Sequence, residues 1–329
     1  MPSQAAISEA NTRFWNDTTD GVAKAALRDA SAMVSSANRL NGALRMAQGR
    51  ESMMVAPEKL DSREHLLGVK NGVVCLKDGT FRAGVWRDFI TKQAGADWIE
   101  EAQCPTWLNF LRETFNGDQE LIDWLQIWVG YCLTGRVDQE ALLFCYGVGA
   151  NGKSVFGNTL AQLFGELGTS VSSALLTRRS DDSAHQRARN ATDGVRLAQI
   201  NEFGTNERLN DEAVKTFASN ETVALRDLHK EFRNVRPTAK ILVRSNHKPA
   251  VIDNSEGLWR RFKLLPFTRI VPEDERDPKL GDKLHEELSG ILRWAVLGAV
   301  RYYSMKGKIP DPAAVKVASA SYRNECDLF

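Results

Sequence analysis

Residues 141–154 read ALLFCYGVGANGKS, an apolar run followed at once by a glycine-rich segment that ends in lysine and serine. The part from Gly147 to Ser154 fits GxxxxGK[ST], a loop whose backbone N–H groups surround phosphate oxygens while lysine reaches the β and γ phosphates. Residues 155–160 continue as a helical pattern whose N-terminus would face the phosphates. This context favours a nucleotide-binding loop over a glycine-rich turn that contains a lysine by coincidence.

The expected ligand of this loop is ATP with Mg²⁺. Lys153 is the expected catalytic cation, and the Ser154 hydroxyl is an expected metal ligand. The residues expected to bind the nucleotide are Gly147, Gly149, Ala150, Asn151, Gly152, Lys153, Ser154 and Val155.

Beyond the loop, short apolar runs alternate with helical patterns. The runs are RLAQI ending at residue 200, KILVRS at 240–245 and KLLPF at 263–267. Such alternation predicts an α/β fold with a parallel sheet. Upstream, apolar and aromatic residues at helical spacing fill 107–128, and Asn71-Gly72 and Asp78-Gly79 indicate small β-hairpins. We therefore expect a mainly helical domain at 1–134 that serves oligomerisation, an α/β core at 135–305 and a helical tail at 306–329.

Bulk composition excludes several classes of protein but does not reveal a partner. The apolar run 291–303 is interrupted by Arg293 and Arg301, so no membrane span is expected. The five cysteines form no CxxC pair, and the N-terminus lacks the pattern of a secretory signal, so a cytoplasmic protein is expected. The net charge is only +1, so any contact with DNA must come from locally placed basic groups.

Three polar positions downstream are candidate catalytic residues. Glu202 follows the run that ends at residue 200, where a carboxylate could activate the attacking water and help to hold the metal. The preceding residue, Asn201, carries no charge, so Mg²⁺ would depend more on Ser154 and the phosphate oxygens. Asn246 follows KILVRS and could orient the γ phosphate. A surface glutamate and an ordinary loop asparagine remain the alternatives for these two positions.

Arg260 and Arg261 precede the run KLLPF. Guanidinium groups stabilise charge on a transferred phosphoryl group, often from a neighbouring subunit. A pair of solvated surface arginines is the alternative, and spacing does not decide which of the two would act.

These elements, in this order, resemble the helicase part of phage and plasmid primase-helicases, superfamily 3 AAA+ helicases related to the poxvirus primase-helicase. The resemblance runs from about Leu66 to residue 305 and rests on NGVVCLKDG, YGVGANGKS, the run before Glu202, LNDEAVKTFASNETVALRDLHKEF, ILVRSNHKP and GLWRRFKLLPF. It implies an AAA+ core with Asn246 as the polar sensor of the γ phosphate. It also implies that Arg260 or Arg261 completes a neighbour's site.

The same resemblance implies a β-hairpin at 223–232 that grips the DNA backbone inside a ring. Lys230, His229 and Arg226 are the expected DNA contacts, and an exposed basic turn is the alternative. We expect a hexameric, ATP-driven DNA helicase of a phage, plasmid or other mobile element in a bacterial host, with a possible primase or replication partner. Relatives commonly carry a primase domain and a winged-helix domain, for which this chain lacks room, so primer synthesis is not expected. The alternative function is a nucleotide-switched DNA-binding or loading module.

Overall fold

The computed structural model describes residues 37–48, 55–177, 182–204, 207–226, 232–251 and 255–327, together with Asp29. The chain divides into two compact units, Met1–Lys59 and Leu60–Phe329. In the first unit, Ala37–Gln48 form helix α3 and Pro57–Lys59 form a short 3-10 helix. Helix α3 lies in the region where a mainly helical domain was expected.

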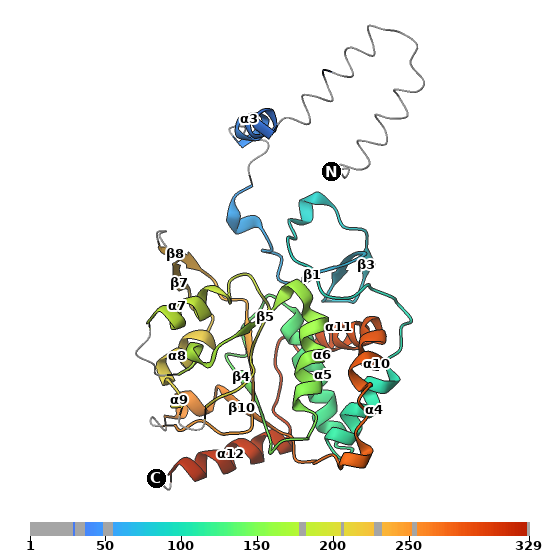
Figure 1. The fold of residues 1–329 in the computed structure, drawn as a ribbon, viewed down its shortest axis with the longest axis vertical. Coiled ribbons are helices and arrows are strands. Elements are labelled where there is room, and N and C mark those ends of the chain that lie inside the picture. Colours follow the sequence, from blue (N-terminus) through green and yellow to red (C-terminus); the bar gives the residue numbers. More distant parts are fainter. Residues whose placement is uncertain are drawn as a thin grey trace. The chain divides into compact units, whose positions relative to one another are not determined.

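A parallel sheet of five strands lies at the centre of the second unit, in the order β10-β4-β9-β6-β5 (Figure 1). Its strands are β4 (Leu142–Tyr146), β5 (Gly168–Val171), β6 (Leu197–Ile200), β9 (Lys240–Ser245) and β10 (Phe262–Pro266). The predicted α/β fold class is confirmed. Four strands coincide with the apolar runs; β5 was not expected, because its sequence GTSV carries little apolar signal.

Helices cover both faces of this sheet (Figure 1). One face packs against α4 (Pro105–Thr114), α5 (Gln119–Leu133), α6 (Lys153–Phe164), α10 (Leu280–Glu286) and α11 (Leu288–Ser304). The other packs against α7 (Asp182–Asn190), α8 (Asp211–Phe217) and α9 (Glu256–Trp259). Side chains of β4 alternate between the two cores, which explains why its sequence is apolar throughout.

Smaller elements complete the second unit. Strands β1 (Leu66–Val69), β2 (Gly72–Cys75) and β3 (Phe81–Arg82) form an antiparallel sheet in the region where hairpins were expected. Helix α12 (Ala313–Asp327) packs along β10, as expected for a helical tail. Short 3-10 helices occur at Trp86–Asp88, Gly165–Leu167, Ser173–Leu175 and Glu273–Glu275. Among the described helices, none has the length and apolar character needed to cross a membrane.

The hairpin predicted at 223–232 is present as an antiparallel pair, β7 (Val223–Arg226) and β8 (Phe232–Val235). Arg226 pairs with Phe232, and residues 227–231 lie outside the described part of the chain. The expected domain boundary at residue 134 falls inside the second unit, where α5 packs along α11, and it stays a prediction.

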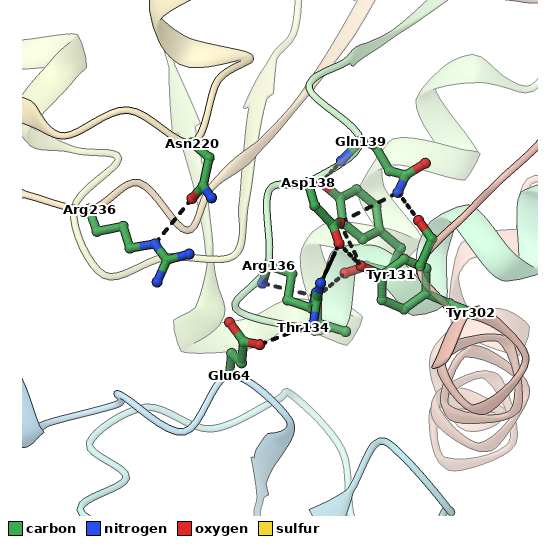
Figure 2. Close-up of polar contacts among 10 residues, drawn as sticks. Glu64, Tyr131, Thr134, Arg136, Asp138, Gln139, Asn220, Arg236 and Tyr302 are labelled. Carbon is green, nitrogen blue, oxygen red and sulfur yellow. Dashed lines mark hydrogen bonds and ion pairs between the residues drawn. The ribbon is translucent and has the colours of Figure 1, made fainter. Parts of the chain in front are cut away.

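A polar cluster secures the connection between α5 and β4, which leads into the glycine-rich loop (Figure 2). Asp138 accepts hydrogen bonds from the Arg136 guanidinium at 2.7 and 2.9 Å and from the Tyr302 hydroxyl of α11. Arg136 also forms an ion pair with Glu64, 3.4 Å away. Burial, followed by the bond to Asp138, raises the pKa of Tyr302. The cluster therefore ties the start of the sheet to the helical layer.

Tyr302→Phe should lower the free energy of unfolding by about 1–3 kcal/mol, because it removes hydrogen bonds to a charged acceptor from a fully buried ring. The measurement is the urea denaturation midpoint. Tyr303→Phe is the matched control, since the buried Tyr303 hydroxyl has no hydrogen-bond partner among the described residues. Equal destabilisation by both changes would contradict this role for Asp138.

Candidate functional site

Three neighbouring strands of the sheet end next to one another, and polar residues follow each of them. Tyr146 of β4 pairs with Ser245 of β9, and Val243 of β9 pairs with Ile200 of β6. Ligand sites in open α/β sheets form at the carboxyl ends of the strands, where these segments meet. The glycine-rich loop, Glu202 and Asn246 are therefore brought to one edge of the sheet.

The loop between β4 and α6 has the backbone conformation that glycine permits. Gly149 and Gly152 have φ angles of 63° and 86°, which glycine adopts without steric cost. A Cβ on Gly152 would lie 3.0 Å from the Phe110 ring, so a larger residue would also crowd that ring. Ala150 also has a positive φ, of 46°, and its carbonyl accepts a hydrogen bond from the Val271 N–H at 2.8 Å.

Lys153 is buried at the base of the loop. Its ammonium donates to the Gly147 carbonyl and, at 2.8 Å, to Asn151 Oδ1. Asn151 in turn donates to the Phe267 carbonyl at 3.1 Å. Burial lowers the pKa of Lys153, as expected for a cation withdrawn from water. All the acceptors it meets are uncharged, so its positive charge is available to an anion bound in the loop.

A cleft of roughly 720 Å³ opens beside the loop. One wall consists of residues 149–155, and the others come from α4 and from residues 269–283. Arg269 joins two walls, since it forms ion pairs with Glu113 of α4 at 3.0 Å and with Glu275 at 2.7 Å. The cleft has the size range of pockets that hold small-molecule ligands. Its outer walls were not predicted from the sequence.

A second hollow, of roughly 290 Å³, continues from the loop along the strand ends. It is lined by Lys153, Ser154, Asn158, Asn201, Glu202, Arg244, Ser245 and Asn246. Three predicted positions, the loop, Glu202 and Asn246, therefore line one continuous site. The oxygen groups of Ser154 and Glu202 fit Mg²⁺ only as partial ligands, because the described residues contain no cluster of three or more acidic, histidine or cysteine side chains.

The two predicted arginines lie at the opposite edge of the sheet. They precede Phe262, which pairs with Leu142 at the amino end of β4. Arg261 has a side chain only 10% exposed and pairs with Glu140 at 3.2 Å, whereas Arg260 is 63% exposed and lies 3.8 Å from Glu140. The strand between them and the loop spans roughly 16 Å at about 3.3 Å per residue, so neither arginine belongs to the loop of its own chain.

The predicted DNA contacts are His229, Lys230 and Arg226. His229 and Lys230 lie outside the described residues, as does the side chain of Arg226, whose backbone belongs to β7.

Arg244 lies in the site but was not predicted as a site residue from the sequence. It occupies β9, two residues before Asn246, and it lines the second hollow although it is almost fully buried. A charged residue within an otherwise apolar central strand was the available signal, because arginine is seldom fully buried without a specific reason.

Comparisons with known proteins give two family matches and several viral relatives for this chain. Residues 5–116 match the family described as D5 N terminal like, and residues 145–261 match a family of unknown function, DUF5906. A putative helicase of Acanthamoeba polyphaga mimivirus is 28% identical over 82% of this chain and 30% of its own length. A putative helicase of Invertebrate iridescent virus 6 is 24% identical, covering 70% of this chain and 25% of the viral protein. A putative primase of African swine fever virus is 25% identical over 63% of this chain and 22% of its own length.

The resemblance to the phage and viral primase-helicase type is confirmed. The first family match begins at residue 5, so the similarity extends upstream of Leu66, where the resemblance was expected to begin. The aligned parts span between about a fifth and a third of the length of these viral relatives.

The fold also has a solved counterpart. The structure described as the A form apo structure of the NrS-1 C terminal region superimposes with a TM-score of 0.56 at 13% identity, covering 80% of this chain and 59% of that one. At this identity the likeness concerns the fold alone.

Proposed function

We propose that this chain is an ATP-hydrolysing DNA helicase or translocase of the superfamily 3 AAA+ type, active in replication as part of a ring, with six subunits as the expected number. The observation that carries the proposal is the convergence of Lys153, Glu202 and Asn246 on one site beside a cleft large enough for a nucleotide. The names of the viral relatives, putative helicases and putative primases, support the same class of activity.

Each residue has a distinct task in this proposal. The loop N–H groups and Lys153 hold the phosphates, and Asn246 orients the γ phosphate. Glu202 accepts a proton from the attacking water. Mg²⁺, held by Ser154, Glu202 and the nucleotide itself, would neutralise phosphate charge.

The position of the arginines supports the proposed ring. Arg260 has an exposed side chain at the edge opposite to its own loop, so in this proposal it acts on a phosphate bound by a neighbouring copy of the chain. Arg261 is held inside its own subunit by Glu140 and by the Gly257 carbonyl, at 3.0 Å. We therefore assign the intersubunit role to Arg260 and a structural role to Arg261.

A nucleotide-switched loading module is the second candidate, because the same loop would serve it. The two functions differ at the hairpin tip. A motor couples its turnover to DNA through Lys230, whereas a switch binds nucleotide and partner without sustained, DNA-stimulated hydrolysis.

Single-stranded DNA should stimulate ATP turnover of the full chain, and Lys230→Ala should abolish most of this stimulation while basal turnover persists. The reason is that the change removes a phosphate contact and leaves the nucleotide site intact. Steady-state phosphate release with and without DNA measures both quantities. Lys316→Ala, an exposed change on α12, is the control. DNA-independent turnover in the unmodified protein, or unchanged stimulation in Lys230→Ala, would favour the switch over the motor.

A further inference from the structure

Arg244 reaches from the sheet into the site from the side of α6. Its guanidinium donates to the Ser154 carbonyl at 3.1 Å, to Asn158 Oδ1 at 3.1 Å and to Asn201 Oδ1 at 2.5 Å. The side chain is 8% exposed, and its Nε has no acceptor among the described residues. Arg244 therefore joins the first turn of α6 to the residue that follows β6.

The packing of α6 leaves space for this guanidinium at one position. A Cβ on Gly157 would lie 2.3–2.4 Å from the Nε, Cδ and Cζ atoms of Arg244. Helix interiors disfavour glycine by about 1 kcal/mol relative to alanine, so the glycine here is explained by the arginine rather than by the helix.

The charge of Arg244 is not cancelled by its contacts. All three acceptors are uncharged oxygens, which differs from Arg136, Arg261 and Arg269, each paired with a carboxylate. Lys153 likewise meets only uncharged acceptors. The hollow is thus lined by two cations that form no ion pair among the described residues, and by the single carboxylate of Glu202.

Asn201 is part of this charge balance. A carboxylate at this position would face the guanidinium at hydrogen-bond distance and neutralise it, whereas the amide accepts the bond and leaves the charge in place. The amide nitrogen of Asn201 donates to the Ser170 hydroxyl at 3.1 Å, which fixes its oxygen toward Arg244. One lone pair of this oxygen is therefore occupied by Arg244.

We propose that Arg244 is a fixed cation of the phosphate site, which lets the chain hold a nucleoside diphosphate without a divalent cation. The guanidinium supplies part of the positive charge that Mg²⁺ otherwise provides to the phosphates. It acts through the electrostatic field of its charge and by holding the Ser154 backbone in place. This inference deepens the proposed nucleotide function and rests on it.

The test is the binding of a fluorescent ADP analogue to the full chain, in excess MgCl₂ and in excess EDTA. Removal of Mg²⁺ should weaken binding by the unmodified protein less than about tenfold, a factor that corresponds to about 1.4 kcal/mol. In Arg244→Gln, affinity in EDTA should fall by a further tenfold or so, while affinity in MgCl₂ changes by less than about threefold, because bound Mg²⁺ then neutralises the phosphates. In Arg244→Gln, the Mg²⁺ concentration that gives half of the maximal effect on ADP binding should also decrease, because the positive guanidinium no longer repels Mg²⁺.

Two further variants keep the test informative if Arg244→Gln does not fold. Asn201→Asp retains the arginine but cancels its charge, and Gly157→Ala displaces the guanidinium through the added methyl group. Both variants should bind the ADP analogue more weakly in EDTA, with little change in MgCl₂. Arg244→Lys should restore part of the affinity, and Lys316→Gln controls for the loss of one positive charge at an exposed site.

Equal weakening in both solutions would mean that Arg244 only supports the fold, and it would overturn the inference. The inference would also be overturned if the unmodified protein bound the ADP analogue in MgCl₂ but not in EDTA. Absence of binding in either solution would overturn the proposed nucleotide function itself, and with it this inference.

Discussion

Lys153→Ala should lower ATP turnover by at least about 100-fold, the scale seen when a single group that stabilises developing charge is removed from an active site. The ammonium is buried, points into the loop and meets only neutral acceptors, so no other group on the loop replaces its charge. Steady-state phosphate release measures the change. Loss of nucleotide affinity should accompany it, because the same charge contacts the ground-state phosphates.

The fold must survive the substitution for this result to be informative. Removing Lys153 leaves Asn151 anchored to the Phe267 carbonyl, so the thermal midpoint should shift little. Lys215→Ala, which removes a lysine from a surface pair with Asp211 on α8, controls for a general effect of lost charge. Turnover that persists in Lys153→Ala, with a normal thermal midpoint, would show that the loop is not the site of hydrolysis.

The position of the loop, Glu202 and Asn246 could be predicted because each follows an apolar run, and parallel strands bring such positions to one edge. The hairpin was implied by the family resemblance, and its two described strands, β7 and β8, are present. Only the placement of the loop, Glu202 and Asn246 therefore needs no more than local sequence and the rules of sheet construction.

The outer walls of the cleft depend on contacts between distant segments. Phe110 of α4 and Val271 meet the loop from positions about 40 residues before it and about 120 after it, and no local pattern records such meetings. Strand β5 was missed because its residues are polar and its pairing with β6, rather than its composition, makes it a strand. The contrasting environments of Arg260 and Arg261 likewise depend on Glu140, which is remote in sequence.

Arg260→Ala should lower ATP turnover of the assembled protein by about 10³-fold, as expected for an arginine that stabilises phosphoryl charge from a neighbouring subunit. Nucleotide affinity should be nearly unchanged, because the loop of the same chain is intact. Arg261→Ala should act differently. It removes the contacts of the buried Arg261 side chain with Glu140 and the Gly257 carbonyl, so we expect a loss of about 1–2 kcal/mol in unfolding free energy and a small effect on turnover per folded subunit.

Mixing subunits distinguishes an intersubunit arginine from one that acts within its own chain. A subunit carrying Lys153→Ala has a defective loop but an intact Arg260, and a subunit carrying Arg260→Ala has the reverse. When the two inactive proteins are combined, the Lys153→Ala subunit can supply its arginine to the intact loop of its neighbour, so turnover should reappear at part of the unmodified level. An arginine that served its own loop would give no recovery in any mixture. If turnover recovered when Lys153→Ala was mixed with Arg261→Ala, and did not recover when it was mixed with Arg260→Ala, the assignment of the two arginines would be reversed.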